Sequence, residues 1–200
     1  MTRPPSRGRR PGAPDTRGQI LEAAREAFAE KGFGRTTIRG IAAEAGVDPA
    51  LVHHYFGNKD DLFLAALEIR VDPRDIVPSV FAQGVHGAGE RLLRVFLSVW
   101  DDPESRLPMV ALVRTSLARE SANTLLHEGM LRLIFAPLIE VLPDDAHRRS
   151  QLVATQMMGL IIGRYILRLE PLASMAPEEV VAWVAPTIQR YFDGEMPDVS

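Results

Sequence analysis

The stretch from Thr36 to Tyr55 constrains this chain most, because it predicts two short helices joined by a tight turn. Apolar residues recur at helical spacing in its first half, and Gly46 follows where a helix can end on a left-handed residue. Glycine adopts that conformation without steric penalty. Asp48 can cap a second helix, and Pro49 suits its first position, because the amide that proline lacks would be unpaired there anyway.

The two predicted helices have the spacing of a helix-turn-helix. Ala42 precedes Gly46 by four residues and Val52 follows it by six, so that a small and a branched residue can close the angle between the helices. Such a motif holds its second helix in the major groove of DNA. An ordinary helix pair inside a bundle has the same pattern and remains the alternative.

Composition predicts a folded intracellular protein. Of 200 residues, 46% are hydrophobic and 24% are charged, in the usual range for a globular chain. The absence of cysteine excludes disulfides and thiolate metal sites. The longest apolar run, Met157 to Gly163, is too short to cross a membrane, and the basic segment 1–14 lacks the apolar region of a signal peptide.

Charge is distributed unevenly along the chain, although the net charge is only −3. Residues 1–60 hold 10 basic against 7 acidic residues, whereas residues 61–200 hold 13 against 19. A basic N-terminal part joined to an acidic C-terminal part would confine attraction for nucleic acid to one part of the molecule. Chance sampling is the alternative explanation of so modest an imbalance.

The periodicity predicts an all-α fold, because no strand-like alternation is found anywhere. We expect a disordered basic tail at 1–14, which either contacts DNA phosphates or stays solvated, a helix-turn-helix domain at 15–60 and a helical body at 61–200. The segment 90–100 looks apolar nearly all round and predicts a buried central helix. The expected helices cover residues 16–32, 36–45, 48–56, 59–70, 73–78, 90–100, 104–117, 121–142 with a bend at Pro137, 146–169 and 177–192.

Local signals mark several helix starts. Thr16 and Gln19 match a capping box, and Asn58 can cap the helix that begins at Lys59. A lysine in the first turn faces the positive end of the helix dipole, which a nearby phosphate would compensate. A surface lysine without a function is the alternative. Thr36 or Thr37 can cap the second helix, where a hydroxyl or amide could also meet a phosphate.

Three segments resemble the tetracycline-repressor (TetR) family of transcriptional regulators: ILEAAREAFAEKGF, TTIRGIAAEAGV and, above all, ALVHHYFGNKDDLF. They cover about residues 15–64, and the helical body is similar in pattern only. The resemblance implies a three-helix DNA-binding domain joined to a helical ligand-binding and dimerisation domain. It also implies a cytoplasmic regulator, bound to the bacterial nucleoid when on DNA, that needs no cofactor. Such a protein is typically a repressor that binds a palindromic operator as a homodimer and is released by a small molecule.

The resemblance also implies roles for individual residues. Those that correspond to base-reading positions are Arg39, Pro49, Ala50 and His53, and those at phosphate-holding positions are His54, Tyr55 and Lys59, with Thr36 or Thr37. Phe56 corresponds to a position in the small core beneath the recognition helix. The predicted recognition helix lacks Arg, Lys, Asn and Gln, so Arg39 on the preceding helix is the expected guanine reader.

The two long C-terminal helices predict a dimer seam. Thr155, Gly159 and Gly163 recur every fourth residue, which would let a partner helix cross closely. Alternatively, these glycines seat a neighbouring helix within the same subunit. The last helix carries a stripe that would complete a four-helix interface: Val180, Trp183, Val184, Thr187, Ile188 and Tyr191.

The middle helices carry large or soft side chains of the kind that line apolar pockets: Phe96, Trp100, Met109, Val113, Met130 and Phe135. Plain core packing is the alternative for each of them. If a pocket exists, its ligand should be an apolar or amphipathic small molecule. We found no glycine-rich phosphate loop, no cysteine nucleophile and no spaced histidine pair, and therefore expect no enzyme and no metal site. An unrecognised enzyme and a helical protein-interaction module remain the rival classes.

Overall fold

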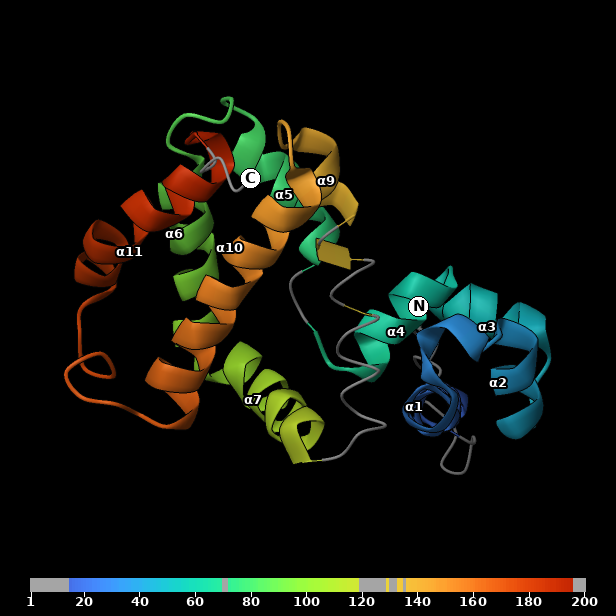
Figure 1. The fold of residues 1–200 in the computed structure, drawn as a ribbon. Helices are drawn as coiled ribbons and strands as arrows, with labels where there is room; N and C mark the ends of the chain where they lie inside the picture. Colours follow the sequence, from blue (N-terminus) through green and yellow to red (C-terminus); the bar gives the residue numbers. More distant parts are fainter. Residues whose placement is uncertain (1–14, 70–71, 119–128, 130–132, 135, 196–200) are drawn as a thin grey trace, which may run out of the picture.

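The computed structural model describes residues 15–69, 72–118, 129, 133–134 and 136–195, and every regular element in these ranges is a helix (Figure 1). The predicted all-α fold is therefore confirmed. The basic tail 1–14 and most of the segment 119–135 lie outside the described residues. The helices are α1 (Thr16–Arg35), α2 (Ile38–Glu44), α3 (Pro49–Phe56), α4 (Lys59–Ala66), α5 (Pro73–Phe81), α6 (Ala88–Asp101), α7 (Pro103–Ala118), α9 (Ala136–Val141), α10 (Ala146–Leu160), its π-helical continuation η2 (Ile161–Ile166) and α11 (Pro177–Asp193).

The helices form two groups with separate cores (Figure 1). In the smaller group, α1 packs against α2 and α4, and three phenylalanines meet at its centre. The Phe63 ring lies edge-on to Phe28 and Phe33, with centroids 5.0 and 5.1 Å apart. Helix α4, which begins within the predicted 15–60 domain and continues into the body, thus belongs to the core of the smaller group.

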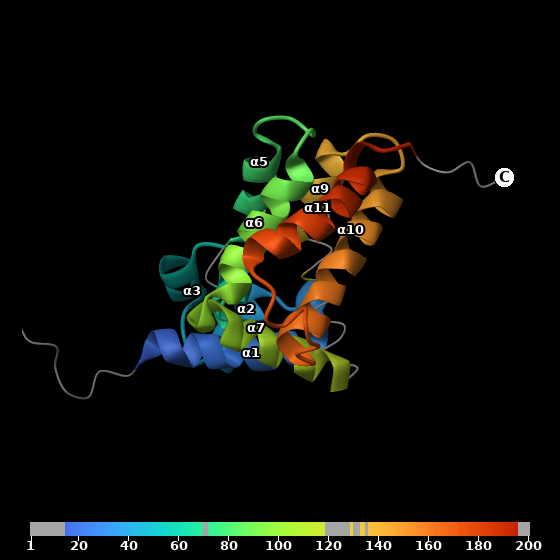
Figure 2. The same ribbon diagram turned by 90° about the vertical axis from the view of Figure 1, so that its left-hand side faces the viewer.

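The larger group contains α5, α6, α7, α9, α10 with η2, and α11, and a further cluster of buried side chains around Trp100 and Tyr165 lies where α6, α7 and η2 meet. Figure 2 shows α11 lying across α6 and beside α10. The contact between α6 and α11 is closest at Gly89, where a Cβ atom would lie 2.8 Å from the carbonyl oxygen of Ala185 and from the amide nitrogen of Gln189. The Gln189 side chain accepts from the Gly89 amide at 3.0 Å and donates to the Val85 carbonyl at 3.0 Å.

Helix α1 does not begin with the predicted capping box, and its regular part ends near the expected residue. Asp15, not Thr16, occupies the N-cap, and its carboxylate accepts from the Gly18 amide at 3.0 Å. Gly32 leaves the helical conformation with φ 76°, close to the expected end of the first helix. Asn58 caps α4 as predicted, by accepting from the Asp61 amide at 2.9 Å.

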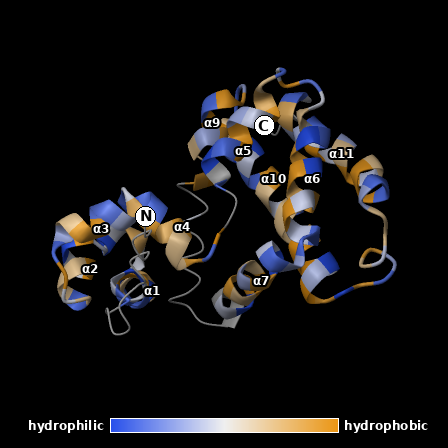
Figure 3. Ribbon diagram, turned by 180° about the vertical axis from the view of Figure 1, so that it is seen from behind, coloured by the Kyte–Doolittle hydropathy of each residue, from blue (hydrophilic) through white to orange (hydrophobic). Residues whose placement is uncertain are grey.

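Two helices differ from the predictions, α4 in its length and α6 in its polarity. Helix α4 ends at Ala66 rather than near residue 70, and Glu68 follows with a left-handed φ of 58°. Helix α6 is not apolar all round: Glu90, Arg94 and Ser98, spaced by four residues, form an exposed polar face. Hydrophilic and hydrophobic segments alternate along it in Figure 3. The error arose because Leu and Val residues between these positions made the segment look uniformly apolar.

Helix α5 continues through Pro78 to Phe81 instead of ending at that proline as expected, whereas the longer helices agree with the predictions. Helix α7 covers 103–118, α10 with η2 covers 146–166, and α11 covers 177–193. The predicted helix 121–142 lies largely outside the described residues, and α9 is its described end. No helix in the described part of the chain is both long and apolar enough to span a membrane.

Candidate nucleic-acid interface and ligand cavity

The turn between α2 and α3 has the geometry that the sequence predicts. Gly46 adopts φ 66°, and the Val47 amide donates back to the Ala42 carbonyl at 2.9 Å, which closes the end of α2. The Asp48 carboxylate accepts from the Ala50 amide at 2.7 Å and begins α3 at once. Ala42 and Val52 are fully buried between the two helices, so the angle between α2 and α3 is fixed by packing.

The outer face of this motif carries exposed side chains. Arg39 on α2 is exposed and makes no hydrogen bond or ion pair within the described ranges. On α3, Ala50, His53, His54 and Tyr55 are exposed and Pro49 is half-buried, whereas Phe56 is buried in the core beneath. The structure therefore brings the predicted base-reading residues of α3 to an open helix surface.

Two ring contacts orient the side chains of α3. The His53 Nδ1 atom lies 2.7 Å from the Gly57 carbonyl oxygen, which can only accept, so Nδ1 carries the proton and donates. The other ring nitrogen, Nε2, is left for an external partner. The His54 ring lies edge-on to Tyr55, with centroids 5.4 Å apart. These contacts reduce the number of orientations available to the side chains before any ligand arrives.

The two threonines before α2 have different roles. Thr37 caps the helix by accepting from the Gly40 amide at 3.0 Å. Thr36 is only 3% exposed, and its hydroxyl donates to the carbonyls of Ala27 and Gly32 at 3.0 and 2.7 Å. The expectation that the Thr36 hydroxyl could meet a phosphate is therefore wrong, because this side chain anchors α1 to α2 from inside the core.

Lys59 has a partner that the sequence did not reveal. Its Nζ atom lies 4.2 Å from the centroid of the Phe33 ring. A cation over an aromatic face is stabilised by the ring electrons, which offsets the unfavourable helix dipole without a phosphate. The electrostatic conflict at Lys59 is thus no evidence for DNA contact.

Two further residues on this surface were missed by sequence reasoning. Leu51 is 39% exposed on α3. Arg17, in the first turn of α1, lies with its guanidinium carbon 5.1 Å from the Phe56 ring centroid, next to the end of α3. No sequence signal distinguishes Arg17 from other arginines, because its placement depends on how α1 packs.

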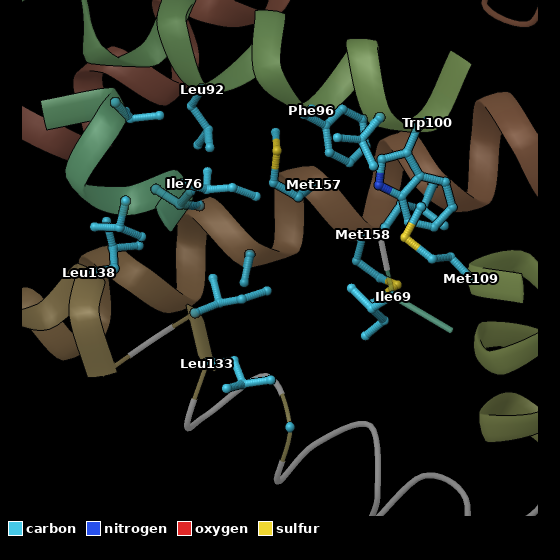
Figure 4. A pocket seen from close by; sticks show the side chains of 18 of the residues that line it. Ile69, Ile76, Leu92, Phe96, Trp100, Met109, Leu133, Leu138, Met157 and Met158 are labelled. Atoms are coloured by element: carbon cyan, nitrogen blue, oxygen red, sulfur yellow. The ribbon is translucent and has the colours of Figure 1, made fainter. Parts of the chain in front are cut away.

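An apolar cavity of about 240 Å³ lies inside the larger helix group and reaches α4 (Figure 4). Its wall includes Phe96, Trp100, Met109 and Val113, four of the predicted pocket residues. Met130 and Phe135 lie outside the described residues. Phe63 of α4 and Leu67, the residue directly after α4, complete the wall on the side of the smaller helix group.

The cavity offers little polarity. Of its described lining, only the two serines Ser105 and Ser150 and the indole N–H of Trp100 offer polar side-chain groups. The Ser150 hydroxyl already donates to the His147 carbonyl at 2.9 Å. Met157 and Met158 line the cavity from α10, and Phe96 and Trp100 line it from α6 (Figure 4). Such a wall accommodates an uncharged apolar molecule and would leave a charged one without compensation.

The predicted dimer residues divide into exposed and buried sets. Thr155, Gly159, Trp183 and Thr187 are exposed, and Trp183 is 74% accessible. Val184 and Tyr191 are half-buried against the second core.

The other seam residues belong to the subunit interior. Val180 and Ile188 are fully buried in the second core, so their assignment to a seam is wrong: they lie on the face of α11 that packs on its own subunit. A Cβ atom on Gly163 would lie 3.0 Å from the Leu172 side chain, so this glycine seats an element of its own subunit.

Comparison with known proteins agrees with this architecture. Residues 20–66 match the family described as bacterial regulatory proteins, tetR family, and residues 86–192 match the tetracyclin repressor-like C-terminal domain. The transcriptional regulator BetI of Agrobacterium fabrum is 32% identical over 193 residues, which cover 91% of this chain and 92% of that protein. The regulator HbdR of Aromatoleum sp. is 29% identical over 123 residues, covering 59% of this chain and 52% of that protein.

A solved structure agrees as well. A TetR-family regulator from Streptomyces coelicolor is 38% identical, with a TM-score of 0.50, over 92% of this chain and 98% of that one. The match to the family's C-terminal domain alone spans more than half of the chain, and the match to its DNA-binding domain includes the whole helix-turn-helix. The chain therefore belongs to the TetR family of helix-turn-helix transcriptional regulators.

Proposed function

We propose that this regulator is a repressor that inserts α3 into the major groove of operator DNA. The observation that carries this proposal is the division of α3 into two faces. Val52 and Phe56 fix the helix to its core, whereas Ala50 and His53 are exposed on α3 and Arg39 is exposed on the preceding helix α2. A helix held rigidly from behind and exposed in front has the form that groove reading requires.

The surface residues divide into base readers and phosphate contacts. Arg39 reads guanine, because its guanidinium is exposed, without a partner among the described residues, and can form a bidentate pair. Ala50 and Leu51 contact thymine methyl groups, and His53 offers Nε2 to a base edge. The phosphate contacts come from His54 and Tyr55 on α3, the α2 start at Thr37, and Arg17 and Lys59 at the margins.

A homodimer would present two such helices to a two-fold operator. The exposed side chains of α10 and α11 provide the seam, with Trp183 as its main apolar anchor. Gly159 supports close helix crossing, because a Cβ atom there would meet no atom within 4 Å. Thr155 and Thr187 line the same exposed faces.

The effector that releases the repressor is an uncharged apolar molecule in the internal cavity. Phe63 of α4 and the adjoining Leu67 form part of the cavity wall, and α4 packs on α1 in the DNA-binding group. An occupant that displaces these side chains changes the position of the two α3 helices relative to each other and lowers operator affinity.

A titration with fluorescent DNA fragments from upstream of the protein's own gene tests the DNA-binding role. A regulator should select one fragment and lose affinity steeply as salt rises, because bound counterions are released from the phosphates. Equal, weak binding to every fragment would contradict the proposal.

Tryptophan fluorescence tests the effector. The chain has two tryptophans, so Trp183→Phe leaves Trp100 in the cavity wall as the only reporter. Because Trp183 is the proposed dimer anchor, emission is measured in this variant and release of DNA in the parent protein. Neutral apolar compounds should change this emission and release the DNA, whereas their carboxylate analogues should do neither through this cavity. Release of DNA without any change at Trp100 would place the effector elsewhere.

A further inference from the structure

A second, polar cavity of about 300 Å³ lies where α6 ends, α7 begins and η2 leads into the connection to α11. We call it the arginine cavity. It shares none of its described lining with the apolar cavity, and Trp100, which lines the latter, directly precedes Asp101. Its lining residues are Asp101, Arg106, Arg164, Tyr165, Arg168, Glu170, Ala173 and Ser174.

One arginine of this cavity has a structural role. Arg164 is 8% exposed, and its Nη1 atom donates to the carbonyls of Leu172 and Met175 at 2.7 and 2.8 Å. Its Nη2 atom lies 3.5 Å from an Asp101 carboxylate oxygen. Arg164 therefore holds the connection to α11 in place, while its Nε atom and the Oδ2 atom of Asp101 are buried and have no hydrogen-bond partner in the described part of the chain.

The Asp101 carboxylate is engaged in the same way. The Tyr165 hydroxyl donates to Asp101 Oδ1 at 3.0 Å. Burial, together with this carboxylate, raises the pKa of Tyr165 above its ordinary value, so the phenol stays protonated and remains a donor. The charges of Asp101 and Arg164 thus compensate each other within the fold.

Two arginines remain available. Arg168 is exposed, has no hydrogen bond or ion pair among the residues described, and adopts a left-handed φ of 53° that a non-glycine residue rarely holds. Arg106 lies with its guanidinium carbon 5.9 Å from the Tyr165 ring centroid and makes one long contact, 3.4 Å, to the Trp100 carbonyl. Glu170 carries the opposite charge, and its carboxylate accepts from the Ser174 hydroxyl at 2.6 Å.

We propose that the arginine cavity binds a small organic monoanion by its carboxylate, held between Arg106 and Arg168, with its carbon body against Tyr165. Three arginines against two carboxylates leave one positive charge, which a single carboxylate neutralises. A phosphate dianion would leave an excess negative charge facing Glu170. Planar guanidinium groups also match carboxylate oxygens in pairs. The volume lies at the lower end of small-molecule sites, which fits a small ligand.

Fluorine NMR of para-fluorobenzoate, titrated with the DNA-free protein, tests this proposal. The expected result is saturable binding, with para-fluorobenzamide, the neutral analogue of the same shape, competing for the para-fluorobenzoate site at least about tenfold more weakly, as the loss of one charged contact predicts. Inorganic phosphate at equal ionic strength should compete poorly. Absence of saturable binding, equal binding of the amide, or stronger competition by phosphate would each overturn the carboxylate site.

Substitution of single arginines tests where para-fluorobenzoate binds. Arg106→Gln and Arg168→Gln should each weaken para-fluorobenzoate by about tenfold, whereas Arg148→Gln removes the same charge from an exposed pair with Asp145 and should change nothing. Unchanged binding in a folded Arg168→Gln protein would place the anion elsewhere and overturn the proposal. Arg168 makes no hydrogen bond or ion pair with a described residue, so Arg168→Gln breaks no such interaction and tests the site even if Arg106→Gln does not fold. The measurement uses no DNA, so its failure leaves the proposed repressor role untouched.

Discussion

Arg74 of α5 binds Asp61 of α4, with an Nη2 to Oδ1 distance of 2.5 Å. The same guanidinium contacts Asp72, the N-cap of α5, at 2.5 Å. Asp61 in turn lies beside the end of α3, because a Cβ atom on Gly57 would be 3.0 Å from its Oδ2 atom. Arg74 thus links the larger helix group to the helix that supports the candidate recognition helix.

Removing this link should affect operator binding more than stability. Arg74→Gln is expected to reduce the free energy of unfolding by less than about 1 kcal/mol, because the pair is partly exposed, but to lower operator affinity by loosening the position of α4. Urea unfolding and DNA titration check the two effects. Arg94→Gln, which breaks exposed pairs with Glu90 and Glu178 far from α3, is the matched control. An equal affinity loss in both variants would refute the linking role.

Asp72 should make stability depend on acidic pH. The hydrogen bonds from Arg74 hold the pKa of Asp72 below its ordinary value of 3.8. A carboxylate with a lowered pKa in the folded state stabilises the protein above its unfolded pKa, and this contribution disappears as pH falls through the folded value. The free energy of unfolding should therefore fall below about pH 4, and fall less in Asp72→Asn, which keeps the N-cap. An equal fall of the free energy of unfolding with pH in Asp72→Asn and in the parent protein would contradict this assignment.

Gly89 should be intolerant of any side chain. In Gly89→Ala the new methyl group would lie 2.8 Å from the Ala185 carbonyl oxygen, so α6 and α11 must separate. Overpacking of this kind costs roughly 1–3 kcal/mol, measurable by urea unfolding. Ser98→Ala on the exposed face of α6 is the control and should stay within about 0.5 kcal/mol of the parent protein. A neutral Gly89→Ala would mean that the two helices are packed less closely.

Trp183 should carry much of the dimer affinity. An exposed tryptophan at the centre of an interface is typically worth at least about 2 kcal/mol on truncation, so Trp183→Ala should weaken dimerisation by about thirtyfold or more. Sedimentation across a concentration series measures this. Leu107 is 68% exposed on α7, outside the proposed seam, and Leu107→Ala should leave the dimer unchanged. A loss of dimer affinity in Leu107→Ala but not in Trp183→Ala would place the interface on α7 instead.

What the sequence predicted well depends on local interactions. Gly46, Asp48 and Asn58 act within a few residues along the chain, so the turn and both caps could be read directly. The burial of Thr36 and the ring contact of Lys59 depend on how α1 packs on its neighbours, which spacing alone does not show. The faces of the last helix could be recognised as a stripe, but not divided between a core and a seam.

The arginine cavity had no sequence signal at all. Arg106 and Arg168 are far apart in the chain, and only the course of η2 and its connection to α11 brings them to one cavity. Four of the apolar cavity residues could be named because large side chains on the middle helices face inward. The contribution of α4 to that cavity could not, since it arises from contact between the two helix groups.

Substitution of Arg39 tests the central claim, that the exposed face of α2 and α3 reads DNA, most directly. Arg39→Ala and the remote control Arg148→Ala should be titrated with operator and with random DNA of equal length. We predict that Arg39→Ala loses about 1–3 kcal/mol on the operator and little on random DNA, the pattern of a base contact, whereas the control loses nothing on either. An equal loss of Arg39→Ala on both DNAs, or none on the operator, would contradict the account.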